Sequence, residues 1–243
     1  MSEKIIEVKD LVKKFGNFVA NDRLTFDVYR GEIFGFLGAN GAGKTTAIKI
    51  LTGLSRPTSG QVQVAGINVS KYPERVKKKI GYMNQSFSLY NDMSVRENFR
   101  FYGGIYGLSK AEIKERTQYY LHKLDMERYG DQLLKSIPLG WKQKLAFSVA
   151  NLHNPGVIFL DEPTGGVDPI TRRQFWELIY EAADRGTTVF VTTHYMDEAE
   201  YCERVAILSE GKLKALDTPA LMKQEFGVTN MNDVFLKLAR NVE

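Results

Sequence analysis

A glycine-rich segment constrains the fold of this chain more than any other feature. Residues 38–45 read GANGAGKT and match the pattern GxxxxGK[ST]. The segment follows EIFGFL, a short apolar run that predicts a buried strand, and precedes TTAIKILTGL, which predicts a helix. In this context the backbone N–H groups and the positive end of the helix face an anion. Because a chance match in such a chain has a probability of about one percent, the segment predicts a nucleotide-binding phosphate loop.

The residue types of this loop predict how it holds a nucleotide. Glycines let the backbone close around phosphate oxygens without a side chain in the way. Lys44 is expected to reach the β- and γ-phosphates of ATP, where it assists catalysis, and the Thr45 hydroxyl is expected to bind Mg²⁺. We expect nucleotide contacts from Gly38, Ala39, Asn40, Gly41, Ala42, Gly43, Lys44, Thr45 and Thr46.

Two adjacent carboxylates follow another strongly apolar segment. VIFL at residues 157–160 predicts a buried strand, and Asp161 and Glu162 come directly after it. Taken alone, such a pair is more often only the polar end of a strand. Beside a phosphate loop, the first carboxylate can hold Mg²⁺ and the second can polarise a water for in-line attack. We therefore predict that Asp161 binds the metal and that Glu162 is the catalytic base.

Gln85 and His194 are two further polar residues that follow apolar segments. Gln85 comes after the apolar IGYM and could meet Mg²⁺ or the attacking water, although by itself it is only a polar loop residue. His194 follows TVFVTT. A lone histidine is more often a surface or core residue than a catalytic one. Since α/β sheets gather their ligands at the carboxyl ends of strands, this position favours a contact of His194 with the γ-phosphate.

The alternation of strand-like and helix-like segments predicts a parallel α/β sheet. Residues 86–150 differ, because they are rich in aromatic and charged residues and have helical spacing. Near residue 210 the pattern indicates a hairpin and then a short helix. The expected strands are 5–9 and 24–29 around a turn at Gly16–Asn17, then 157–160 and 188–192; the expected helices lie near 111–124 and 170–185, and the late hairpin turns at Glu210–Gly211.

Composition narrows the class of protein. The 243 residues contain no uninterrupted apolar run of about 18 residues, so we expect no membrane span. The N-terminus lacks an apolar signal core, and the single cysteine, Cys202, excludes an internal disulfide and fits a reducing cytosol. The net charge of +4 is modest, and the basic run Lys77–Lys79 is more simply a solvated surface than a nucleic-acid site.

Taken in order, these features resemble the ATP-binding cassette family from about residue 4 to residue 238. The series is the phosphate loop, Gln85, a helical insertion, a signature-like stretch, FLDEPT, Asp168 and His194. An ordinary P-loop kinase or GTPase does not carry this series. The resemblance implies an α/β fold with a P-loop, RecA-like core and a parallel sheet. It also implies an antiparallel N-terminal β subdomain and an inserted helical subdomain.

The resemblance also implies a domain organisation. Residues 1–243 are expected to form a single nucleotide-binding domain. Its core and β subdomain are expected at about 1–85 and 151–243, and its helical subdomain at about 86–150.

The family pattern implies further residue roles. Phe15 takes the place of the aromatic residue that stacks on adenine, although it could also be a hydrophobic turn residue that packs under the first sheet. Asp161 corresponds to the Mg²⁺ carboxylate, Glu162 to the general base and His194 to the switch histidine. Asp168 corresponds to the residue that couples two ATP sites. The family works as a head-to-tail pair of cassettes, so a second such domain is an expected partner, either as a homodimer or as a different paired cassette.

The signature stretch departs from the family pattern, which is usually close to LSGGQ. The aligned residues here are IPLGW at 137–141, followed by KQKLAFSVANLHNP. Pro138 replaces the serine whose hydroxyl would touch the γ-phosphate of the partner, and Leu139 replaces the first glycine. Proline removes a hydroxyl and a backbone N–H, yet it suits the start of a helix. The N–H groups of Leu139 and Gly140 could therefore still face an anion.

Three stretches of the sequence resemble the drug-export branch that serves ABC-2-type membrane subunits. They are IPLGWKQKL, GVDPITRRQFW and THYMDEAEYCERVAIL. This implies an ATPase on the cytoplasmic face of the membrane that drives a separate permease, with residues 86–130 presenting the groove for the permease's cytoplasmic helices.

Two other functions remain open from the sequence. One is a soluble mechanochemical cassette acting on ribosomes or DNA, but such relatives usually carry two cassettes or a coiled-coil insertion, and this chain has neither. It also lacks a dense basic face, so we expect no nucleic-acid partner. The other is a nucleotide-gated binding module with an inactive site. The altered signature allows it, whereas Glu162 and His194 oppose it.

Overall fold

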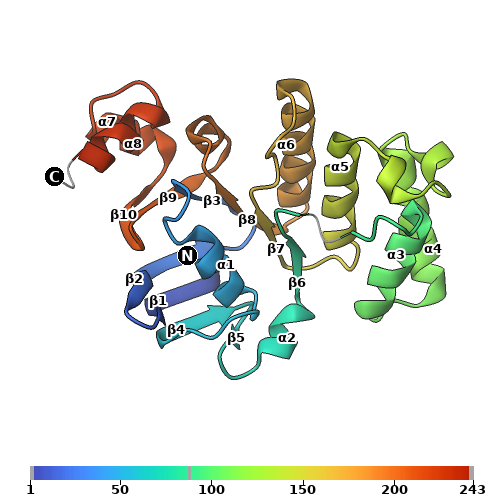
Figure 1. Ribbon diagram of the computed structural model, residues 1–243, viewed down its shortest axis with the longest axis horizontal. Coiled ribbons are helices and arrows are strands. Elements are labelled where there is room, and N and C mark those ends of the chain that lie inside the picture. The colour runs from blue at the N-terminus through green and yellow to red at the C-terminus, as the bar shows by residue number, and fades with distance from the viewer. Residues whose placement is uncertain (1–2, 87–88, 241–243) are drawn as a thin grey trace.

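The protein, seen in a computed structural model that describes residues 3–86 and 89–240, is built around two sheets (Figure 1). The larger sheet has six strands in the order β10-β9-β3-β8-β7-β6, and those from β9 to β6 run parallel. The smaller sheet is antiparallel, in the order β2-β1-β4-β5. The predicted α/β fold, with a parallel core, an antiparallel N-terminal sheet and a helical insertion, is confirmed.

The elements alternate along the chain as the sequence pattern indicates. The strands are β1 (Lys4–Phe15), β2 (Phe18–Tyr29), β3 (Ile33–Gly38), β4 (Ser59–Val64), β5 (Ile67–Asn68), β6 (Ile80–Met83), β7 (Val157–Asp161), β8 (Thr188–Thr193), β9 (Arg204–Ser209) and β10 (Lys212–Asp217). The helices are α1 (Lys44–Leu51), α2 (Pro73–Lys77), α3 (Val95–Ile105), α4 (Lys110–Lys123), α5 (Leu139–Ala150), α6 (Pro169–Asp184), α7 (Pro219–Glu225) and α8 (Met231–Arg240), with short 3-10 turns η1 (Glu127–Tyr129), η2 (Leu134–Ser136) and η3 (Met196–Tyr201).

The central sheet is apolar on both faces because each face is covered. In β3, the side chains of Phe34 and Phe36 join a core that includes α1 and the antiparallel sheet. Ile33 and Leu37 join the other core, which includes residues of α5 and α6. Strands buried on both sides read as continuous apolar runs, which explains why EIFGFL and VIFL were recognisable. Figure 1 shows α1 beside the antiparallel sheet and α3 and α4 at the opposite end of the molecule.

The parallel strands bring four predicted site segments to one edge of the sheet. Leu37 of β3 pairs with Thr193 of β8, and Asp161 of β7 pairs with Thr192. Met83 of β6 pairs with Leu160. Because these strands run in the same direction, their carboxyl ends lie together. The phosphate loop, Gln85, the two carboxylates and His194 therefore leave the sheet at the same edge.

Most element boundaries differ from the expected ones by a few residues. Both early strands are longer than predicted, and they meet at the predicted Gly16–Asn17 turn. The first helix ends at Leu51, because the chain turns at Gly53, where φ is 74°. The late hairpin and the helix after it are confirmed, whereas β4, β5, α2 and α8 had no counterpart in the predictions. Residues 1–2, 87–88 and 241–243 of the expected domain lie outside the described residues.

No helix in the described part of the chain is both long enough and apolar enough to cross a membrane.

Candidate nucleotide-binding and catalytic site

The phosphate loop has a backbone that only glycine fits at two positions. Gly43 has φ 101°, and a Cβ there would lie 2.4 Å from the carbonyl oxygen of Ala20. Gly38 would place a Cβ 2.6 Å from the carbonyl oxygen of Leu208. Gly41 also has a positive φ, of 84°, but a Cβ there would meet nothing within 4 Å. The loop is therefore wedged between β2 and β9 and turns directly into α1.

Lys44 is the first residue of α1, and its side chain is only 4% exposed. Its ammonium donates to the carbonyl oxygens of Gly38, at 2.7 Å, and Ala39, at 3.2 Å. The same nitrogen lies 3.3 Å from Oε1 of Glu162. A buried ammonium held by loop carbonyls can exchange them for the oxygens of a bound phosphate, since charged acceptors make the stronger hydrogen bond.

Glu162 is the point at which the predicted catalytic side chains converge. Its Oε2 lies 3.1 Å from Nδ1 of His194 and accepts a hydrogen bond from the Gln85 amide at 3.2 Å. Its backbone has φ 50°, the left-handed region that a side chain seldom adopts. Two contacts to Thr192 hold this conformation, because the Glu162 N–H donates to the Thr192 carbonyl and hydroxyl oxygens at 3.0 and 3.1 Å. Backbone strain of this kind is typical of functional sites.

Asp161 is buried beside Glu162 and is only 3% exposed. Its Oδ1 accepts a hydrogen bond of 2.6 Å from the Thr192 hydroxyl. Burial raises the pKa of Asp161 and the nearby Glu162 charge adds to this effect, whereas the Thr192 hydrogen bond and the charge of Lys44 act in the opposite direction. Thr192 thus orients the carboxylate of Asp161 and holds the backbone of Glu162. It was not among the predicted site residues, although its place at the end of β8 is the signal that could have identified it.

A cavity of about 440 Å³ lies beside these residues. Phe18 lines it, whereas Phe15 does not appear in its wall. Phe15 is 56% exposed, and the Lys13 ammonium lies 4.9 Å from its ring centroid. Both aromatics flank the same turn, so the adenine contact of Phe15 stays a prediction and Phe18 becomes a second aromatic for that role. The cavity is lined by Phe18, Ala20, Asn40, Gly41, Gly43, Lys44, Thr45, Thr46, Gln85 and Glu162.

The signature-like stretch and Asp168 line a different cavity, of about 360 Å³. Pro138 immediately precedes α5, so the N–H groups of Leu139 and Gly140 are in its first turn and have no acceptor within the helix. Asp168 caps α6 by accepting from the Ile170 and Thr171 N–H groups, both at 3.0 Å. The Thr171 hydroxyl also donates to Oδ2 of Asp168, at 2.6 Å. This hydrogen bond most of all, together with those of the two N–H groups, lowers the pKa of Asp168. This cavity shares no lining residue with the first one.

Trp141 and Lys144 of the second cavity were not predicted as site residues. The Lys144 ammonium lies 4.6 Å from the centroid of the Trp141 ring and donates to Oε1 of Gln174 at 2.6 Å. Burial lowers the pKa of Lys144. Gly140 packs closely in this wall, because a Cβ there would lie 2.5 Å from Cγ2 of Thr171 and would have to displace that side chain. In this chain the wall formed by the signature-like stretch and the turn after it therefore contains one buried cation, Lys144, packed on Trp141.

The residues that line the first cavity, together with Asp161 beside it, fit ATP with Mg²⁺. The backbone at Gly43 leaves no room for a side chain, and a buried cation stands at the start of α1. The predicted metal ligands Thr45, Gln85 and Asp161 offer hydroxyl, amide and carboxylate oxygens, which are the ligands that Mg²⁺ prefers. The Gln85 amide nitrogen is directed to Glu162, so the amide oxygen remains for a cation.

Comparisons with known proteins agree with this geometry. Residues 21–165 match the family described as ABC transporter. A probable multidrug ABC transporter ATP-binding protein of Escherichia coli, YbhF, is 46% identical over 92% of this chain, which spans only 39% of that relative's length. The linearmycin resistance ATP-binding protein LnrL of Bacillus subtilis is 31% identical over 98% of this chain and 79% of its own length.

Solved structures give the same result. An ATP-binding subunit of an ABC transporter superposes with a TM-score of 0.88 at 31% identity, covering 97% of this chain and 99% of its own. A dimeric cassette in a post-hydrolysis state, bound to ADP and Pi, has a TM-score of 0.80 at 25% identity, covering 88% of this chain and 98% of its own. The chain therefore belongs to the ABC transporter family and is one of its ATP-binding, ATP-hydrolysing cassettes.

Proposed function

We propose that this chain is the Mg²⁺-dependent ATPase subunit of an exporter. It forms one nucleotide-binding domain, whose core and β subdomain span about 1–85 and 151–243 and whose helical subdomain spans about 86–150. It works on the cytoplasmic face of a membrane with separate ABC-2-type permease subunits. The observation that carries the proposal is the convergence of Lys44, Gln85 and His194 on Glu162, beside the phosphate loop.

In this proposal each side chain has one task. Lys44 holds the β- and γ-phosphates in place of its present carbonyl partners. Glu162 accepts a proton from the attacking water, and His194 contacts the γ-phosphate while its Nδ1 fixes the carboxylate. Bound Mg²⁺, held by Thr45, Gln85 and Asp161, supplies positive charge to the phosphate oxygens. The hydrogen bonds to Glu162 orient the base before ATP arrives, which lowers the cost of organising the site in the transition state.

The second cavity supports a head-to-tail pair of cassettes. Its wall presents the first N–H groups of α5 and the buried Lys144 ammonium, both of which favour an anion. The phosphate cavity of the same chain is separate, so this wall is available to the nucleotide of another cassette. We infer that a second copy or a related cassette supplies that nucleotide, and that Asp168 lies where the two sites meet.

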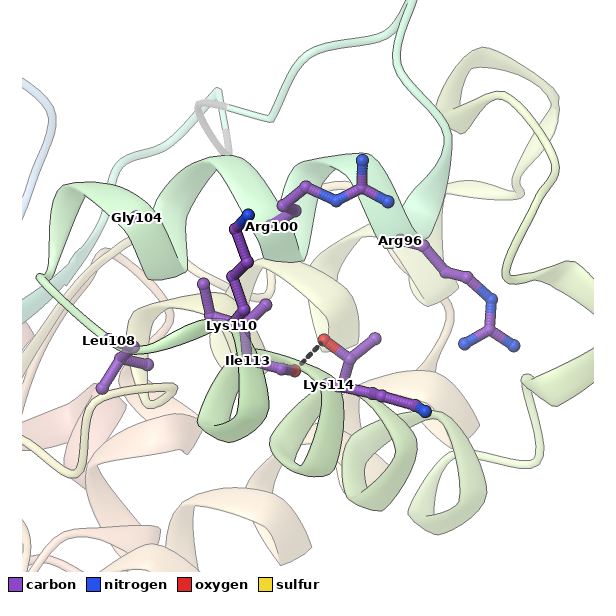
Figure 2. Close-up of a pocket in the computed structure, with 8 residues that line it drawn as sticks. Arg96, Arg100, Gly104, Leu108, Lys110, Ile113 and Lys114 are labelled. Carbon is purple, nitrogen blue, oxygen red and sulfur yellow. Dashed lines mark hydrogen bonds between the residues drawn. The ribbon is translucent and has the colours of Figure 1, made fainter.

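A groove between α3 and α4 supports the membrane partner. This cavity of about 620 Å³ has Gly104, Leu108 and Ile113 on its wall, together with four basic side chains. Figure 2 shows them on both helices around the cavity. Arg96 is paired with Asp131 at 3.4 Å, whereas Arg100, Lys110 and Lys114 have no ion pair among the described residues. An apolar wall with unbalanced positive charge fits a permease segment that carries apolar residues and carboxylates.

The transporter assignment is tested with the complete complex. The chain is co-expressed with its membrane subunit and purified from detergent-solubilised membranes, and ATP hydrolysis is measured with the permease present. We expect co-purification and permease-dependent turnover. The double variant Arg100→Glu and Lys114→Glu should lose both, whereas Lys77→Glu with Lys79→Glu, a basic pair outside the groove, should keep both. A wild-type chain that hydrolyses ATP but binds no membrane protein would contradict the exporter assignment.

A further inference from the structure

A buried carboxylate outside the predicted site joins three of its segments. Glu198 lies in η3 and is 0% exposed. Its Oε1 accepts a hydrogen bond from the hydroxyl of Thr164, two residues after Glu162. Burial raises the pKa of Glu198, and hydrogen bonds from Thr164 and Thr193 and the charge of Arg172 oppose this effect. A buried carboxylate needs such partners, so these segments are held together.

Arg172 connects this carboxylate to the start of α6. It lies one helical turn after Asp168, and its backbone N–H donates to the Asp168 carbonyl at 3.0 Å. Its side chain is 20% exposed, and its Nε lies 3.6 Å from Oε1 of Glu198. The guanidinium also lies 4.3 Å from the centroid of the Tyr195 ring and 3.3 Å from Oδ2 of Asp197. One planar cation therefore contacts three residues of the segment that follows His194.

The contacts continue from Tyr195 to the catalytic carboxylate. The rings of His194 and Tyr195 have centroids 4.1 Å apart at an interplanar angle of 35°, and Nδ1 of His194 lies 3.1 Å from Oε2 of Glu162. A contiguous series thus runs from the second cavity, through Asp168 and Arg172, to His194 and Glu162. Each step is a hydrogen bond, an ion pair or a ring contact, and such contacts transmit small displacements because packed groups do not deform continuously.

We propose that Arg172 and Glu198 are positioning residues that fix His194 against Glu162 and tie both to the start of α6, where a second cassette would contact Asp168. The inference rests on the proposed roles of Glu162 and His194 and extends them to two residues that touch no nucleotide. The planar guanidinium is suited to this task because it can stack on Tyr195 while it pairs with a carboxylate.

The kinetic test uses the full-length protein and compares two arginines that are neighbours in sequence. Arg172→Gln and Glu198→Gln should lower kcat for ATP hydrolysis by about tenfold to a hundredfold, while the Kd for Mg·ATP stays at the wild-type value. Arg172→Lys keeps the charge without the planar stack and should give an intermediate kcat. The matched control is Arg173→Gln, whose pair with Glu177 is exposed on the same helix; it should keep the wild-type kcat.

A spectroscopic measurement separates positioning from a general loss of structure. The chain has three histidines, so ¹⁵N-histidine labelling gives one set of ring signals for each. The His194 signals should shift in Arg172→Gln and Glu198→Gln and stay in place in Arg173→Gln, whereas the His122 and His153 signals should not move in any of them. Should Glu198→Gln fail to fold, Arg172→Gln, which alters a partly exposed side chain, carries the same test.

The outcomes distinguish this inference from the proposed function. Wild-type kcat and an unmoved His194 signal in both variants, with an inactive Glu162→Gln, would overturn the inference alone. A fully active Glu162→Gln would overturn the proposed catalytic site on which it rests. Equal loss of Mg·ATP affinity and kcat would mean that the pair only stabilises the fold, and this would also overturn the positioning role.

Discussion

Replacing Gly43 by alanine tests the loop geometry quantitatively, because a neighbouring glycine provides the control. Gly43 has φ 101°, and its new Cβ would lie 2.4 Å from the Ala20 carbonyl oxygen and 2.6 Å from Nδ2 of Asn21. The left-handed backbone alone costs an alanine about 1–2 kcal/mol. Forcing an extra carbon into packed surroundings adds about 1–3 kcal/mol. We therefore expect Gly43→Ala to lower the free energy of unfolding by about 2–5 kcal/mol.

Gly41→Ala is the matched control in the same loop. Its φ is 84°, but its Cβ would meet nothing within 4 Å, so only the backbone term of about 1–2 kcal/mol applies. For a chain of this size, each kcal/mol lowers Tm by about 2–4 °C. Urea and thermal unfolding of both variants measure the difference, and Mg·ATP calorimetry should show the larger loss of affinity for Gly43→Ala. Equal destabilisation of the two variants would refute the steric argument.

Three further predictions follow from the site and its surroundings. Lys44→Ala should abolish Mg·ATP binding in calorimetry, because no other buried cation lines the described part of the phosphate cavity; undiminished affinity would show that the loop is assigned wrongly. Pro138→Ser with Leu139→Gly, in a Glu162→Gln background, should tighten the ATP-bound dimer in ultracentrifugation, because the serine adds a hydrogen bond of about 1.5–3 kcal/mol to a charged group. An equal or weaker dimer would show that the natural IPLGW stretch does not weaken dimerisation. The free energy of unfolding of the wild type, minus that of Glu198→Gln, should decrease as the pH rises above the ordinary carboxyl value of 4.5. Burial raises the folded-state pKa of Glu198, so the folded state holds a proton that the unfolded chain has lost. A difference that is constant or grows between pH 4 and about 7 would contradict the buried environment.

The sequence predicted the central sheet, and the place of the polar residues at one edge of it, because both depend on local patterns. The apolar runs that became β3, β7 and β8 are buried on both faces and therefore have a composition that is easily recognised. The polar residues after them were placed correctly at one edge, because parallel strands have no other arrangement for their carboxyl ends. β4 escaped prediction because its exposed first half, SGQ, shows no alternation, and it is defined by its pairing with β1.

Contacts between distant segments could not be predicted from the sequence. Thr192 orients Asp161 across two strands, and the contact of Arg172 with Glu198 joins a helix to a later turn. Phe18 lines the nucleotide cavity although Phe15 matches the family pattern, since both flank one turn and their orientation depends on the hairpin. In each case the sequence contained the residue type, whereas its partner depended on the folded arrangement.

The most direct measurement of the central claim is ATP turnover and assembly of Glu162→Gln. The substitution keeps the shape of the side chain but removes the carboxylate that polarises water. With Mg·ATP, we expect this variant to bind nucleotide at wild-type affinity, to hydrolyse it very slowly and to accumulate as an ATP-bound dimer in sedimentation velocity. Wild-type turnover would move the catalytic base to another residue, and a variant that stays monomeric with ATP bound would contradict the shared site.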